Sequence, residues 1–292
     1  EAARVLSKSK FQNSIMLVGL SGEEQGLVGG KYLAEKAKTE GWDIIGVINN
    51  DMIGNSEGIT NIKDNRSFRI FSEPVPSELT EQQKIWYRFY GGEVDGPSRQ
   101  LARYIESISR KYLPDLNPML VYRIDRFGRG GHHQPFNDVG FTAVRLMETH
   151  EHYDHQHQDV RTEDGRVFGD LIEYVDFDYA AKLTAVNIVT LASLADSPPP
   201  PLTLMIGGIV SPSTQLKWTM QPSNNLAGYK VYWRESSAPI WEHNRWVGMN
   251  DNVTLENIII DHYLFGVSSV SKDGHESIVQ YPMTLMPRPV QQ

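Results

Sequence analysis

The chain has 292 residues and a formal net charge of −8, and 40% of its residues are hydrophobic. That length can bury a sizeable core and predicts two domains. The acidic balance, without any Lys/Arg-rich stripe, argues against nucleic acid or an anionic membrane as the main partner. No apolar run reaches the roughly 18 residues that a membrane-spanning helix needs. The chain has no cysteine, so His, Asp and Glu side chains must bind any metal.

The chain begins at Glu1 rather than at Met, inside a segment, Glu1–Lys8, that has the pattern of an amphipathic helix already under way. We therefore expect that an upstream segment was removed or left out. A signal peptide, a pro-segment or part of the first domain would each fit.

Residues 1–195 alternate short apolar runs with segments of helical spacing. Strands are predicted over Ser14–Leu20, Ile44–Asp51, Pro118–Ile124 and Phe141–Met147, and helices over Gly26–Lys38, Ser98–Leu113 and Phe177–Leu194. This order predicts an open α/β sheet, in which ligands gather at the carboxyl ends of the strands. The polar stretch from Asn55 to Pro97 is too long for a simple connection and is expected to be an ordered insertion or a lid.

The segment Asp196–Pro201 contains four consecutive prolines and predicts an extended linker between a domain at 1–195 and another at 202–292. Short alternating strands are predicted beyond it, over Gln215–Thr219, Ala227–Arg234 and His262–Val270. They indicate an all-β, immunoglobulin-like sandwich. The placement of its aromatic residues makes this part resemble a fibronectin type III module.

Two adjacent carboxylates, Glu23 and Glu24, follow the first predicted strand. One interpretation is structural: Ser21-Gly-Glu-Glu24 matches a capping box, in which Ser21 caps the next helix and Glu24 bonds back to its backbone. A capping box does not need two glutamates, however. The alternative is that the pair belongs to a catalytic site.

Further polar residues are expected at the same edge of the sheet. Asp51 ends the second predicted strand, His132 and His133 follow a glycine-rich loop, and His150–Asp159 holds four histidines and three acids. Carboxylates and imidazoles without thiolates are the ligand set of catalytic zinc. One glutamate of the pair could then bind metal while the other acts as the base.

The motifs GEEQGLVGG, NNDMIG, GHHQPFNDVGFTAVRLME and YDHQHQDVR, in this order, resemble the zinc exopeptidase family that includes bacterial secreted di-zinc aminopeptidases, glutamate carboxypeptidase and glutaminyl cyclase. The resemblance implies a three-layer, open, mostly parallel sheet of the zinc aminopeptidase type, incomplete at its N-terminus. It implies that Glu23 is the general base, that Glu24 and His155 bind one zinc, and that Asp51 binds the other. It also implies a secreted or periplasmic protein.

Two departures from the family pattern stand out. His132-His133 replaces the usual Asp-His pair, so a role of these two residues near the substrate is an open expectation. The family's first metal ligands, including the Asp that bridges two zinc ions, have no counterpart in this chain. We therefore expect partial or no zinc loading and little activity here, although two ions are expected in the full-length parent. An exposed sheet edge that another chain covers is a further expectation.

The resemblance favours a metal-dependent aminopeptidase that acts on a peptide substrate. A glutaminyl cyclase-like acyltransferase is the alternative within the same fold. A non-catalytic binding protein, with the fibronectin-like module as its interaction surface, is a third possibility, and that module could equally be a spacer or a folding partner.

Overall fold

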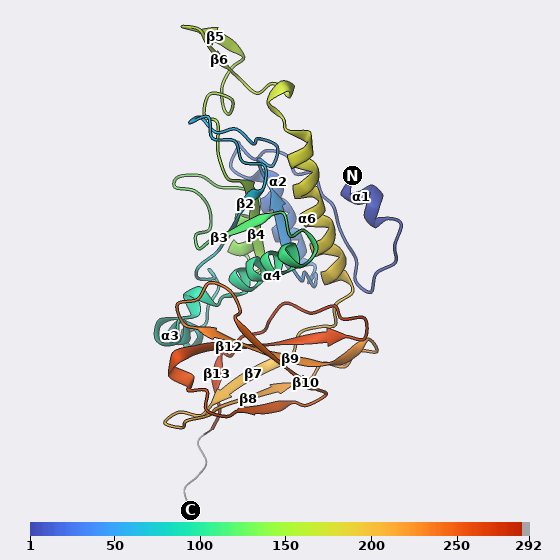
Figure 1. The fold of residues 1–292 in the computed structure, drawn as a ribbon, viewed down its shortest axis with the longest axis vertical. Coiled ribbons are helices and arrows are strands. Elements are labelled where there is room, and N and C mark those ends of the chain that lie inside the picture. Colours follow the sequence, from blue (N-terminus) through green and yellow to red (C-terminus); the bar gives the residue numbers. More distant parts are fainter. Residues whose placement is uncertain (288–292) are drawn as a thin grey trace, which may run out of the picture. The chain divides into compact units, whose positions relative to one another are not determined.

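The computed structural model describes residues 1–287, which form two compact units (Figure 1). The first unit contains Glu1–Lys10, Leu17–Ser77 and Ile105–Leu191. The second contains Phe11–Met16, Glu78–Tyr104 and the chain from Ala192 onward. Among the described residues, no helix has the length and apolar character needed to cross a lipid bilayer.

A four-stranded sheet forms the centre of the first unit. Its strands are β1 (Val47–Asn50), β2 (Ser67–Ser72), β3 (Asn117–Val121) and β4 (Ala143–Glu148), in the order β1-β4-β2-β3. The pairs β1–β4 and β2–β3 are parallel, and β2–β4 is antiparallel. Strands β1, β3 and β4 confirm sequence predictions, whereas β2 lies inside the stretch that was expected to be an insertion.

Helices α2 (Val28–Thr39) and α6 (Phe177–Ala195) cover the two faces of this sheet, and α5 (Gln134–Asp138) packs beside α2. The short α1 (Ala2–Leu6) begins the chain, and η2 (Ile172–Tyr174) precedes α6. Val47 packs in a cluster with Ala34 of α2 and Phe136 of α5, whereas Asn50 bonds to Asn187 of α6. Residues three apart on a strand point to opposite faces, so α2 and α6 lie on opposite sides of the sheet. The mixed α/β class is therefore confirmed.

The predicted strand Ser14–Leu20 is wrong: within the described chain this segment has no strand partner. Met16 and Leu17 are 62% and 50% exposed. Among the strands of residues 1–287, β1 pairs only with β4 and so forms an edge of the sheet. An apolar run indicates which side chains a strand would bury. The strand forms, however, only where a neighbouring strand can pair with its backbone N–H and C=O groups.

The second unit contains a β-sandwich. One sheet has the order β10-β9-β12 and the other β11-β8-β7-β13. The strands are β7 (Leu202–Gly207), β8 (Thr214–Thr219), β9 (Leu226–Glu235), β10 (His243–Gly248), β11 (Asn252–Leu255), β12 (Tyr263–Ser271) and β13 (Thr284–Leu285), with η3 (Ile260–His262) between β11 and β12. Trp218 and Tyr229 meet in the core with ring centroids 5.5 Å apart. Residues 288–292 of the predicted second domain lie outside the described residues.

Residues 78–104 also belong to the second unit. They form α3 (Glu81–Tyr90), η1 (Gly92–Val94) and the first part of α4 (Pro97–Tyr112). Helix α3 begins at a capping box in which Thr80 and Gln83 bond reciprocally. The proline segment has no regular structure and is bonded to the sandwich: Ser269 donates to the carbonyl of Pro199 at 2.7 Å. The domain boundary at 196–201 stays a prediction.

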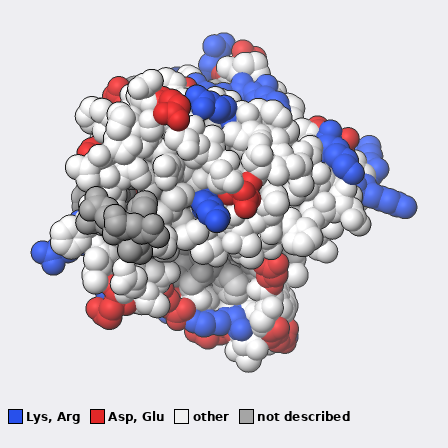
Figure 2. All heavy atoms as spheres, turned by 90° about the horizontal axis from the view of Figure 1, so that it is seen from below, with Lys and Arg blue, Asp and Glu red and all other residues white. Residues whose placement is uncertain are grey.

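Charges of both signs are scattered over the face of the molecule that Figure 2 shows. That face has no broad area of a single sign. A small hairpin, β5 (Arg161–Glu163) with β6 (Arg166–Phe168), stands apart from the four-stranded sheet of the first unit (Figure 1).

Candidate active site

The two adjacent glutamates lie on a turn that precedes α2. The backbone N–H groups of Gly26 and Leu27 donate to the carbonyl of Glu23 at 3.1 and 2.8 Å. Leu27 is the N-cap of α2, with a left-handed φ of 62°, and no side chain in the described part of the chain caps the helix. The capping-box interpretation is therefore wrong, and the structure leaves both carboxylates available for other interactions.

Glu23 is partly buried and lies near other charged groups. Its pKa is raised, first because burial disfavours the charged carboxylate and then because Asp51 and Glu24 add negative charge nearby. His132 and Arg145 oppose this shift. Glu23, Glu24 and Asp51 therefore share one electrostatic environment with Arg145 of β4, which the sequence analysis had not singled out.

Asp51 is bound by an arginine of the neighbouring strand. Arg145 Nη2 lies 2.9 Å from Asp51 Oδ2 and donates to the Asp51 carbonyl at 3.2 Å. Its Nη1 donates to Asp125 Oδ2 at 2.7 Å. Strands β1 and β4 are parallel with Asn50 opposite Leu146, which brings the end of β1 beside Arg145. A buried cation therefore lies against a predicted metal ligand.

His132 and His133 are both buried. His133 Nε2 bonds to the carbonyl of Ile124 at 2.8 Å and lies 3.7 Å from Asp125 Oδ2. Burial lowers the pKa of His133 to about 4, so its imidazole is neutral near pH 7. The His132 ring packs against Gly30 of α2. A Cβ atom added at Gly30 would stand 2.6 Å from His132 Cδ2. The predicted position of this pair near the substrate stays a prediction.

The histidine-rich loop approaches the acidic turn through His157. Its Nδ1 atom lies 3.4 Å from Glu24 Oε1. His155, the predicted ligand, is instead stacked between His152 and Tyr174, with ring centroids 3.5 and 3.6 Å away. Burial, followed by the nearby His152, lowers the pKa of His155. The assignment of His155 as a ligand therefore stays a prediction, with His157 two positions away in contact with Glu24.

The donor groups match zinc in kind but not in arrangement. Carboxylates and neutral imidazoles are zinc ligands, and the Nδ1 atoms of His152 and His155 are buried without a hydrogen-bond partner. Over residues 1–287, however, no group of three or more His, Asp and Glu side chains is arranged to hold a metal ion. The described residues do not form a closed zinc site by themselves.

Two charged residues of β4 were missed by the sequence interpretation. Arg145 is 1% exposed, and Glu148 is a buried carboxyl whose Oε2 atom has no hydrogen-bond partner among the described residues. Burial raises the pKa of Glu148 to about 8. The sequence contained a sign of both residues, because a cation and an acid stand in the apolar run that forms β4. All six residues of this strand are buried.

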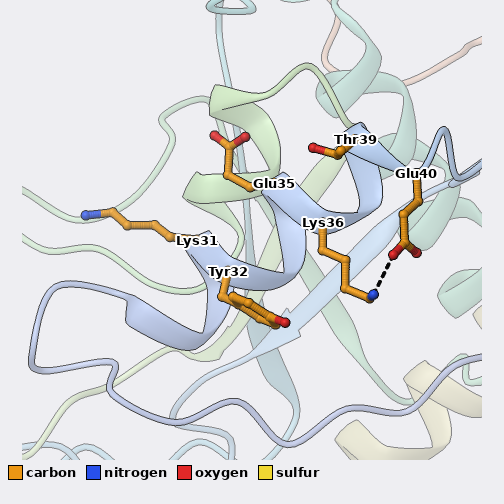
Figure 3. Close-up of a pocket in the computed structure, with 6 residues that line it drawn as sticks. All are labelled: Lys31, Tyr32, Glu35, Lys36, Thr39 and Glu40. Atoms are coloured by element: carbon orange, nitrogen blue, oxygen red, sulfur yellow. Dashed lines mark hydrogen bonds and ion pairs between the residues drawn. The ribbon is translucent and has the colours of Figure 1, made fainter.

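A separate hollow of about 450 Å³ lies along the outer face of α2 (Figure 3). It is lined by Lys31, Tyr32, Glu35, Lys36, Thr39 and Glu40, and Lys36 is paired with Glu40 across it. All six residues come from one helix and its cap, and none belongs to the predicted site. This hollow is therefore distinct from the candidate active site.

The chain is similar to several known proteins. The chain is 40% identical over 285 residues to a "Probable zinc metalloprotease" of Pyrenophora tritici-repentis, an alignment that covers 97% of this chain and 59% of that relative. Among solved structures, the aminopeptidase LapA of Legionella pneumophila matches with 17% identity and a TM-score of 0.46, covering 68% of this chain and 44% of that one. The fn3 domain of human collagen alpha-1(XX) matches with 21% identity and a TM-score of 0.24, covering 32% and 92%.

The sequence profile described as "Peptidase family M28" matches residues 1–171, which is more than half of the chain. The matched range contains the acidic turn, Asp51 and the histidine-rich loop. The chain belongs to peptidase family M28.

Proposed function

We propose that the protein is a zinc-dependent peptidase that cleaves at a chain terminus, as an aminopeptidase, with Glu23 as its general base. Membership of family M28 and the description of the 40% identical relative as a probable zinc metalloprotease support zinc and peptide hydrolysis. The observation that carries the assignment of the base is the position of Glu23, partly buried beside Asp51 and Glu24, with a raised pKa.

A carboxylate with a raised pKa is a better proton acceptor than an ordinary surface glutamate, because its protonated form is stabilised. Glu23 would take a proton from the water that attacks the peptide carbonyl and return it to the leaving amine. Glu24 and His155 are proposed to bind one zinc ion, and Asp51 the other. The fibronectin type III character of the sandwich and export from the cell are also proposed, both on the motif resemblance.

We further propose that these residues alone bind zinc weakly. A catalytic zinc ion usually has three protein ligands, and no such group is found in the described part of the chain. Asp51 is already paired with the buried guanidinium of Arg145. A metal ion at Asp51 would have to compete with that pair or share the carboxylate with it.

Hydrolysis of aminoacyl-p-nitroanilides tests this function. The assay should be run with added zinc on this chain and on the longest form that its gene encodes. The proposal expects the longest form to release p-nitroaniline from substrates with a free amino group and not from N-acetylated ones. Equal rates on N-acetylated peptides would refute the aminopeptidase mode. Cyclisation of an N-terminal glutamine without hydrolysis would favour the acyltransferase alternative.

A further inference from the structure

We propose that the C-terminal sandwich (residues 202–287) is the binding partner of residues 78–104 of its own chain, and that the two form one structural element. Residues 78–104 are called the insertion segment below; they overlap only in part with the stretch Asn55–Pro97 that was expected to be an insertion. This assignment goes beyond peptidase activity and does not depend on it. It opposes the view of the sandwich as a detachable module that recognises another molecule.

A buried carboxylate of the insertion segment is the centre of the interface. Asp95 Oδ1 accepts from Arg234 Nη2 of β9 at 2.9 Å and lies 3.2 Å from Arg103 Nη1. Gln100 Nε2 donates to the same oxygen at 2.8 Å. The side chains of Asp95, Arg103 and Arg234 are only 6%, 2% and 1% exposed. A single acid of the insertion segment therefore orders two arginines, one from each partner.

Each arginine also bonds to the backbone of the other partner. Arg103 Nε donates to the carbonyl of Pro239 in the sandwich at 2.7 Å. Arg234 Nη2 donates to the carbonyl of Val94 in the insertion segment at 3.2 Å. The Trp241 ring lies near both guanidinium groups, 5.9 Å from that of Arg103 and 5.4 Å from that of Arg234. The contact is reciprocal rather than a chance approach of two surfaces.

Aromatic side chains of α3 complete the interface. Trp86 belongs to the same buried hydrophobic cluster as Leu216, Trp218 and Phe265 of the sandwich. The hydroxyl groups of Tyr87 and Tyr281 are hydrogen-bonded at 2.9 Å and buried. The sandwich core therefore includes a side chain that lies more than a hundred positions earlier in the sequence.

Separation of the two partners would be unfavourable for a clear physical reason. It would leave Arg234 without the carboxylate that neutralises it and would expose one side of the sandwich core. The insertion segment would likewise keep Asp95 without its hydrogen bond from Arg234. A covalent linker is therefore not needed to hold these parts together.

Cleavage of the linker tests this inference in the complete chain. A protease recognition sequence is inserted between Pro199 and Pro200, the folded chain is cut, and the fragments are analysed by size-exclusion chromatography. The proposal expects the fragments to co-elute. Separate elution, with the C-terminal fragment still unfolding cooperatively, would overturn it.

Matched variants show whether the described interface holds the fragments. Asp95→Asn should raise the fragment dissociation constant by at least about 10-fold, whereas the control Glu276→Gln, which alters contacts of Lys230 and Tyr232 within the sandwich, should not. If Asp95→Asn does not fold, Tyr87→Phe provides the milder change, with an expected increase of roughly 3- to 10-fold. Equal dissociation of the variant used and the Glu276→Gln control would also overturn the proposal.

Discussion

Arg145 Nη2 lies 2.9 Å from Asp51 Oδ2, so a buried guanidinium holds the carboxylate that ends β1. The arginine side chain is 1% exposed, whereas that of Asp51 is 31% exposed. Asp51 is therefore anchored from the protein interior while part of it still faces outward. Asp125, with no exposed side-chain surface, holds the same arginine through its other nitrogen. Burial alone would raise the pKa of Asp125, but the charge and hydrogen bond of Arg145 lower it overall.

Replacement of this arginine should be strongly destabilising. Arg145→Met leaves Asp125 buried without its cation, and loss of one partner of a buried pair typically costs about 3–5 kcal/mol. Urea unfolding followed by fluorescence measures the change. Arg166→Met is the matched control, because Arg166 is 61% exposed in its pair with Asp154 and should cost less than about 1 kcal/mol. Equal losses in the two variants would contradict the proposed anchoring.

Glu148 should make stability fall as the pH rises. Its pKa is raised by burial to about 8 in the folded protein, against 4.5 for an ordinary glutamate. Between these values the folded state keeps a proton that the unfolded state has lost, so the free energy of unfolding decreases with increasing pH. Glu148→Gln removes the pH dependence that this ionisation gives to the free energy of unfolding. The variant should therefore gain stability relative to the wild type between pH 5 and pH 8, by more than the roughly 1.4 kcal/mol of one pKa unit.

Denaturant unfolding at pH 5, 6.5 and 8 measures the effect of Glu148. The comparison depends on the difference between variant and wild type at each pH, which cancels the contributions of groups common to both. A constant difference across the range would show that Glu148 ionises normally in the folded protein.

His133 should act in the opposite direction. Burial lowers its pKa from 6.5 to about 4, so between these values the unfolded state binds a proton that the folded state does not. The stability that the neutral, buried His133 contributes to the folded protein is complete above pH 6.5 and is lost as the pH falls toward 4. Between pH 6.5 and pH 4 the wild type should therefore lose on the order of 2–3 kcal/mol of unfolding free energy through this residue, and His133→Gln should not show that loss. His243→Gln, at an exposed position, is the control, and identical acid profiles for the two variants would contradict this assignment.

Much of the fold could be predicted because its signals are local. Helical spacing located α2, α4 and α6, and apolar runs located β1, β3 and β4, all within a few residues. Strand β2 was missed because Ser67–Ser72 carries a short apolar pattern inside a polar stretch. The predicted strand at Ser14–Leu20 failed because an apolar pattern does not reveal whether a neighbouring strand exists.

The candidate site could be predicted only in part, for a similar reason. The motifs identified the acids and histidines, and the structure brings Glu23, Glu24 and Asp51 into one environment. The partner of Asp51 is 94 positions away, and no local pattern indicates such a pair. The choice between His155 and His157 depends on the path of a loop, which spacing alone does not define.

Calorimetric titration with zinc should show weak binding to this chain. The described residues form no group of three ligands, so we expect no high-affinity site. Addition of zinc should accordingly raise the midpoint of thermal unfolding little, because a ligand stabilises the folded state only slightly when its concentration is well below its dissociation constant. Tight binding of two ions by these 292 residues alone would contradict the expectation.

The most direct test of the central claim compares the two adjacent glutamates in the longest form that the gene encodes. Zinc content and kcat on an aminoacyl-p-nitroanilide are measured for Glu23→Gln and Glu24→Gln. We expect Glu23→Gln to keep its zinc and to lose about 10²- to 10⁴-fold in kcat, whereas Glu24→Gln should lose zinc as well. A Glu23→Gln variant with full zinc content and a kcat within about twofold of the wild type would contradict the assignment of Glu23 as the base.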